Sequence, residues 1–155
     1  MSGIAARTGV PAARAGLEAA IRAALTDEPE VDIYPGFQWP VNYPDWTALG
    51  QATSETDPKN IGPRRQMDET ITIDVNVGAW RPGRGREVAQ AAYDRVFSLL
   101  VKIQNYILDG DNITLGGAVL WCVPGGFDAD GEEFEGGFQA EIAARFVCSH
   151  RMRAN

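Results

Sequence analysis

The sequence predicts a single α+β domain in which a mostly antiparallel or mixed β-sheet packs against two main helices, in the order helix, strands, helix, strands. The chain has 155 residues, 45% of them hydrophobic, which is enough to bury one contiguous core. Two segments carry apolar residues at helical spacing, and several shorter segments alternate between apolar and polar residues as strands do. We therefore expect one domain that spans residues 1–155.

The first helix is expected over residues 11–26. Its apolar residues recur every four positions at Leu17, Ile21 and Leu25, and a proline in its first turn favours helix initiation. The alternating run at 31–34 then predicts a short strand.

An irregular excursion, either a loop or a hairpin, is expected over about 35–68. It contains five prolines, which interrupt both helices and sheet ladders. Within it, residues 47–53 suit a strand, and residues 56–67 suit an exposed loop or the tip of a long hairpin. Connections of this length often serve binding.

The clearest strand covers residues 69–80, because apolar and polar residues alternate strictly from Ile71 to Val77. The longest helix is expected over 87–108, where apolar residues follow helical spacing throughout. Its length and apolar stripe predict that it is the main core helix.

Two further strands, at 118–123 and 138–148, are expected to close the chain. The segment of about 124–137 between them is rich in glycine and acidic residues. It predicts a hairpin with a mobile acidic tip.

The charge of the chain limits its partners. The net charge is −7 and the sequence pI is about 4.7, so the chain is a poor candidate for gripping nucleic acid, whose phosphates bind Lys and Arg. The same charge would suit a wall past which nucleic acid slides. No apolar run approaches the roughly 18 residues that a bilayer-spanning helix needs, so we expect no membrane partner.

Cys122 and Cys148 each lie in an apolar, strand-like run. They are interpreted as two small core residues of a protein that folds in a reducing cytoplasm. A disulfide between them would require their strands to be neighbours, and two cysteines do not make a disulfide framework.

No catalytic, metal or cofactor site stands out, so we do not expect an enzyme. His150 is the only histidine, and it is interpreted as an exposed side chain near the chain end, not as the base of a catalytic triad. One histidine and two separated cysteines give no zinc spacing. The acidic stretch 128–135 resembles a calcium loop but lacks the EF-hand spacing, so a solvated hairpin tip is preferred.

Two other features each have two interpretations. Residues 81–86 hold three arginines and two glycines before the second helix; they suit an anion nest, but a plain strand-to-helix turn is preferred because the residues of a phosphate-binding loop are missing. The aromatic trio Trp39, Tyr43 and Trp46 would either cover the open face of the sheet or anchor an interface.

The order of these elements resembles the tail terminator proteins, also called tail completion or minor tail proteins, of long-tailed bacteriophages. The resemblance covers nearly the whole chain and lies in the arrangement of elements, not in an invariant motif. The features that carry it are the opening helix with Leu17, Ile21 and Leu25, the strand Val31-Asp32-Ile33-Tyr34, a long irregular excursion, the strand Glu69-Thr70-Ile71-Thr72-Ile73-Asp74-Val75, the helix 87–108, and a closing strand pair that ends in Phe146-Val147-Cys148.

The resemblance implies a structural virion subunit that forms a six-membered ring on the head-proximal end of the tail tube. Such a ring ends tube polymerisation, joins the tail to the head connector and lets DNA pass without binding it specifically. The implied partners are further copies of the chain, the major tail tube protein and the head–tail connector protein. The implied location is the tail of the virion, after synthesis in the host cytoplasm, and no cofactor is implied.

Two groups of side chains are candidates for these contacts. Arginines pair with acids of a neighbouring subunit, and Trp and Tyr are enriched at interface hot spots. Contacts between subunits are therefore expected from Arg81, Arg84, Arg86, Trp39, Tyr43 and Trp46. Contacts with the tube or connector are expected from the two predicted tips, at Asp57, Lys59, Arg64, Arg65, Asp128, Asp130, Glu132 and Glu133.

Two other classes of protein stay open. One is a different head–tail connector or neck subunit, which would bind the portal side and not cap a tail tube. The other is a small-molecule-binding domain or enzyme built on the same α+β plan. That class needs a pocket with convergent polar groups, and the sequence offers none.

Overall fold

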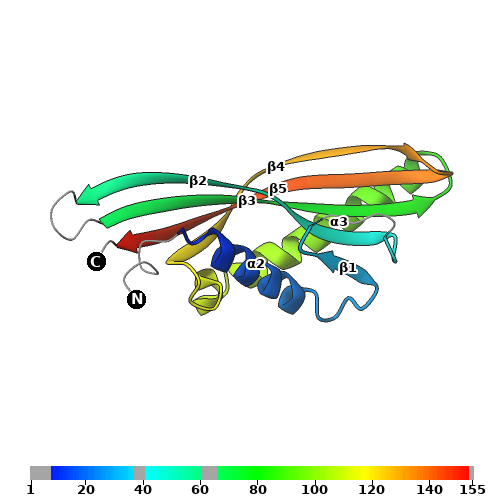
Figure 1. Cartoon of the computed structure of the whole chain (residues 1–155). Coiled ribbons are helices and arrows are strands. Elements are labelled where there is room, and N and C mark those ends of the chain that lie inside the picture. The colour runs from blue at the N-terminus through cyan, green and yellow to red at the C-terminus, as the bar shows by residue number, and fades with distance from the viewer. Residues whose placement is uncertain (1–7, 37–40, 61–65, 154–155) are drawn as a thin grey trace.

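The computed structural model describes residues 8–36, 41–60 and 66–153, apart from the side chains of Lys59, Asn60 and Arg153, and it confirms the α+β fold (Figure 1). The helices α2 (Val10–Ala24) and α3 (Arg86–Ile107) lie against the same face of one β-sheet and leave its other face open (Figure 1). A short 3-10 helix, η1 (Gly110–Thr114), follows α3.

The sheet has five strands in the order β1-β2-β3-β5-β4. β1 runs parallel to β2 and the other neighbours are antiparallel, so the sheet is mixed, as predicted. The central strand β3 pairs with β5 along its whole length. The strands are β1 (Val31–Tyr34), β2 (Asp45–Asn60), β3 (Gln66–Pro82), β4 (Trp121–Phe134) and β5 (Gly137–Arg153).

One core lies between the helices and the sheet. Both helices form within two residues of the predicted bounds, because their apolar stripes can be buried only against the sheet. Each large apolar side chain removed from water contributes roughly 1.5–3 kcal/mol. The buried residues include Leu17 and Ile21 of α2, Ala92, Val96, Leu99, Leu100, Ile103 and Ile107 of α3, Ile71, Ile73, Val75 and Val77 of β3, and Ala140, Ile142, Ala144, Phe146 and Cys148 of β5.

The excursion predicted over about 35–68 is more regular than expected. Strand β2 starts at Asp45 and pairs with β3 as far as Asn60 and Gln66, so the alternative of a long hairpin is the correct one. Pro58 is tolerated inside β2 because this part of β2 lies at the edge of the sheet, where a missing N–H breaks no second ladder. Residues 37–40 and 61–65 lie outside the described part.

The acidic segment of about 124–137 forms a hairpin, as predicted, but most of it is strand and not tip. β4 continues to Phe134 and pairs with β5 throughout, and only Glu135 and Gly136 form the turn. Both turn residues have positive φ, 47° and 77°, as tight two-residue hairpin turns require. The residues Pro124 to Phe127, which suggested a loop, are absorbed by a register shift in the edge strand.

The sheet is longer than the helical layer. Strand β3 has 17 residues, about 55 Å at the usual rise of a strand, whereas α3 has 22 residues, about 33 Å. The end of the β2–β3 hairpin therefore extends past both helices (Figure 1).

Candidate assembly surface

Most of the exposed large apolar side chains lie on or just after α3 and on or just before β4. Seven such side chains are exposed in the described part of the chain, and six of them lie on α3, at its C-cap or at residues 120–127. These six, which we call the apolar stripe, are Phe97, Val101, Leu108, Leu120, Trp121 and Phe127. Trp121 alternates with the buried Cys122, so its side chain lies on the face of the sheet away from the helices. The rings of Phe97 and Phe127 meet edge to face with their centroids 5.8 Å apart, which joins the helix to the strand. Single exposed apolar residues are ordinary, but a gathered group marks an interaction site.

The apolar stripe borders an open edge of the sheet. β4 is an edge strand, and within the described residues it pairs only with β5. The opposite edge is formed by β1 and by β2 beyond Gly50, because β1 pairs only with residues 45–48. Open edges present unpaired backbone groups to which a strand of another chain can add. The two edges carry different residues, so a contact between them would join unlike surfaces.

Arg81 was predicted at a subunit interface, but its guanidinium is already paired within the chain. It donates two hydrogen bonds to the carboxylate of Asp45, at 2.6 and 3.1 Å. Arg95 of α3 donates to the same carboxylate at 2.7 Å and to Glu28 at 2.9 Å. Hydrogen bonds from Arg95, with help from Lys102, outweigh desolvation and lower the pKa of Glu28. Arg81 therefore belongs to an ion-pair network that ties β2, β3 and α3 to the loop after α2.

Arg84 and Arg86 are placed differently from Arg81. Both are exposed, Arg84 in the turn after β3 and Arg86 at the start of α3. Neither forms an ion pair with another described residue. Their predicted role in contacts between subunits stays a prediction.

The aromatic trio is divided by the structure. Trp46 is only 3% exposed and lies over Gly78 of β3, so it covers the open face of the sheet. Tyr43 is 40% exposed and remains available to a partner. Trp39 lies outside the described residues.

The candidate tube and connector contacts lie at opposite ends of the sheet. Asp57 of β2 pairs with Asp68 of β3. Asp130 of β4 pairs with Glu141 of β5, and Glu141 in turn pairs with Gly78 of β3. Asp68 and Gly78 are ten residues apart along β3, so the two groups of candidate contacts are separated by about 33 Å. The side chain of Lys59, and Arg64 and Arg65 altogether, lie outside the described residues.

The acidic residues of β4 also divide between the two faces of the sheet. Asp128, Asp130 and Glu132 alternate onto the face away from the helices, and Glu133 points to the helical side. The carboxylate of Asp128 accepts a hydrogen bond from Arg145 at 3.2 Å. Asp130 and Glu132 are exposed, and neither forms an ion pair with another described residue.

A polar cluster around Glu69 was missed by the sequence analysis. The Glu69 side chain is fully buried, and it accepts hydrogen bonds from the N–H of Gly9 at 2.7 Å and from the hydroxyls of Thr8 and Ser54. Nδ1 of His150 lies 3.1 Å from the same carboxylate. His150 is thus a partly buried residue of β5, and its interpretation as an exposed terminal side chain was wrong. The sequence did contain a signal for this cluster. Glu69 lies two residues before Ile71, so it falls on the same buried face of the strand as Ile71, Ile73 and Val75.

The two cysteines lie in neighbouring strands, directly opposite each other in the register of β4 and β5. Both thiols are free and fully buried, as expected for core residues. The hydrogen bond with Cys148 and burial raise the pKa of the Cys122 thiol.

Metal and membrane sites were also sought. In residues 8–36, 41–60 and 66–153, no group of three or more His, Cys, Asp or Glu side chains is arranged to hold a metal ion. Over the same ranges, neither helix is both long and apolar enough to cross a membrane.

Comparison with known proteins finds no family model that matches this chain and no significant match among curated proteins. The choice among functions therefore depends on the geometry of its surfaces.

Proposed function

We propose that this chain is a structural subunit that assembles into a ring through the apolar stripe and the edge of β4, and that the ring caps the head-proximal end of a bacteriophage tail tube. The observation that carries the proposal is the apolar stripe. A lone subunit would leave these six large apolar side chains 36–51% exposed to water, and each square ångström of apolar surface buried by assembly contributes about 25 cal/mol. The aromatic members, Phe97, Trp121 and Phe127, are of the kind that anchors interfaces.

The two edges of the sheet support a ring in particular. One edge is β4 with the apolar stripe, and the other is β1 with the outer part of β2. When unlike surfaces of identical subunits join head to tail, the assembly closes into a ring if the rotation between subunits allows it. Strand addition between unlike edges would give each subunit one neighbour on either side.

The length and charge of the subunit suit the proposed position. Candidate polar contacts occur at both ends of the long sheet, which supports a subunit that meets the tail tube at one end and the head connector at the other. Six copies would carry a charge of about −42, because each carries −7. Such a ring would repel DNA phosphates, so DNA would slide through it without specific binding.

Native mass spectrometry of the purified protein, followed by negative-stain imaging, tests the proposal. We expect a species of about 101 kDa, six copies of 16.8 kDa, with a central hole. The double variant Phe97→Ser, Phe127→Ser should be monomeric while keeping the helical and strand signals of its circular dichroism spectrum. The control Ala91→Ser, Ala129→Ser changes exposed residues of the same two elements outside the apolar stripe and should assemble normally.

Purified tail tubes provide the second part of the test. The wild-type protein should bind only at tube ends and stop their growth. A wild-type protein that stays monomeric and ignores the tube ends would contradict the proposal. Binding to the connector without binding to tubes would identify a connector subunit instead, and a ring unaffected by the Phe97→Ser, Phe127→Ser change would exclude the apolar stripe as its interface.

A further inference from the structure

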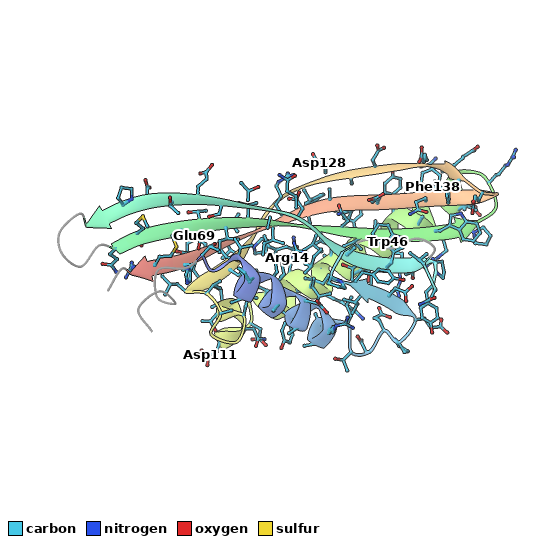
Figure 2. All side chains as sticks on the ribbon, viewed as in Figure 1. Arg14, Trp46, Glu69, Asp111, Asp128 and Phe138 are labelled. Atoms are coloured by element: carbon cyan, nitrogen blue, oxygen red, sulfur yellow. The ribbon has the colours of Figure 1, made fainter. Side chains whose placement is uncertain are left out.

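A pocket of about 410 Å³ opens on the sheet face away from the helices, close to where β3 ends and the β4–β5 hairpin turns. Four aromatic side chains line it, together with Glu135 and Gln139. The aromatic residues are Tyr43, Trp46, Trp80 and Phe134. Figure 2 labels Trp46 toward the same end of the sheet as Phe138, the second residue after the turn.

Two glycines build the walls of this pocket. A Cβ atom at Gly78 would lie 2.3 Å from the ring of Trp46, and one at Gly137 would lie 2.5 Å from the ring of Trp80. Each indole therefore lies flat against backbone that carries no side chain. Nε1 of Trp80 donates to the carbonyl oxygen of Phe134 at 2.7 Å, which fixes the orientation of its ring. Trp46 and Trp80 are therefore held in place before any partner binds.

The part of the β4–β5 hairpin nearest the pocket carries only acidic charged side chains. The sequence from Trp121 to Glu141 contains six acidic residues and no lysine or arginine. Glu135 lies in the pocket, and Asp130 and Glu141 are directly opposite each other on the same face. Like charges in opposite positions destabilise a sheet, and neither carboxylate forms an ion pair with another described residue. A cation from outside would relieve this repulsion.

We propose that this pocket binds an arginine or lysine side chain presented by a basic segment of another protein. Trp and Tyr rings attract a cation placed over their faces, and the guanidinium of arginine also stacks on them. Glu135 supplies the opposite charge, and the amide of Gln139 supplies a hydrogen-bond acceptor.

The acidic surface continues beyond the pocket, which favours a protein segment over a free small cation. Asp130 and Glu141 lie two positions along the strands from Glu132 and Gln139, about 7 Å further from the turn. A chain with two cationic side chains would reach both the pocket and this pair. The inference rests on the proposed function only for the source of the segment, which would be a neighbouring protein of the tail.

The test uses the acetylated, amidated peptide Gly-Arg-Gly-Arg-Gly and a twin in which citrulline replaces arginine, titrated into the full chain by calorimetry. The arginine peptide should bind at least tenfold more tightly than its neutral twin, and its affinity should fall as salt rises. Tyr43→Ser and Glu135→Gln should each weaken binding of the arginine peptide about tenfold. The matched controls Thr53→Ser and Glu55→Gln alter exposed residues of β2 far from the pocket and should bind as the wild type does.

Three results would overturn the proposal. They are no binding of the arginine peptide, equal binding of its citrulline twin, and binding that Tyr43→Ser and Glu135→Gln leave unchanged. The Phe97→Ser, Phe127→Ser variant should still bind the peptide. If the wild type binds the peptide but neither assembles nor caps tubes, the proposed function fails and the cation pocket stands.

Discussion

Glu69 and His150 lie directly opposite each other on β3 and β5, with Nδ1 of His150 3.1 Å from Oε1 of Glu69. The same carboxylate accepts the backbone N–H of Gly9 at the start of α2 and a hydroxyl from Ser54 of β2. One buried side chain thus joins three strands to the first helix. A buried carboxylate is costly unless its oxygens are bonded, and here both oxygens are.

The first prediction concerns the pH dependence of this cluster. Burial alone would raise the pKa of Glu69, but hydrogen bonds from Gly9, Ser54, Thr8 and His150 outweigh it and hold the pKa below 4.5. A lowered folded-state pKa means that stability is present above the unfolded value near 4.5 and is lost as pH falls through the folded value. Urea unfolding at a series of pH values should show this loss.

The variant Glu69→Gln isolates the effect. It should cost about 1–3 kcal/mol near neutral pH, because the amide cannot accept all of these bonds. Its free energy of unfolding should change less than that of the wild type below pH 4.5. Glu55→Gln, on the exposed side of β2, is the control and should match the wild type. Identical pH profiles for Glu69→Gln and wild type would contradict the assignment.

The second prediction separates the three arginines that follow β3. Arg81→Glu would place a carboxylate against Asp45 and should lower the free energy of unfolding by about 1–3 kcal/mol. Arg84→Glu with Arg86→Glu should change stability by less than about 0.5 kcal/mol, because both side chains are exposed and unpaired with described residues. Under the proposed function, the same double change should weaken assembly into a ring. Thermal unfolding and native mass spectrometry measure the two effects, and full-length, infectious particles from the Arg84→Glu, Arg86→Glu variant would rule out the interface role.

The sequence predicted those parts of the fold whose pattern is local. Apolar and polar residues alternate strictly from Ile71 to Val77, and α3 carries apolar residues at helical spacing along its whole length. The strand and the helix were therefore both predicted. The acidic part of β4 was misjudged because Pro124, Gly125 and Gly126 are loop-forming residues. In the structure an edge strand accommodates them as a register shift.

The candidate site depends more on distant partners, which no local pattern shows. Asp45 forms its ion pair with Arg81 and not with Arg84 because the register between β2 and β3 places Arg81 next to Asp45. The apolar stripe joins Phe97 to Phe127 across 30 positions of sequence. Each residue alone looks like an ordinary surface position, so their meeting follows only from the strand order.

A third prediction tests how Trp46 is seated. A Cβ atom at Gly78 would lie 2.3 Å from the Trp46 ring, so Gly78→Ala should displace the indole and cost about 1–3 kcal/mol. The near-ultraviolet circular dichroism signal of tryptophan should change as well. Gly36→Ala is a matched control, because a Cβ atom there meets nothing within 4 Å. Equal stability of the two variants would show that the indole has room to move.

The last prediction concerns the thiols of Cys122 and Cys148. Both side chains are fully buried, and the hydrogen bond with Cys148, together with burial, raises the pKa of the Cys122 thiol. The same hydrogen bond lowers the pKa of Cys148, so burial is what protects that thiol. Because the reagent must reach the sulfur, iodoacetamide at pH 8 should modify neither cysteine in the folded protein and both in urea. Mass spectrometry of timed samples gives the rate, which should follow the population of unfolded protein and so increase in the destabilised Glu69→Gln variant. Rapid modification of the folded wild type would mean that β4 separates locally from β5 without global unfolding. Such local opening would argue against the edge of β4 as the interface of the proposed ring.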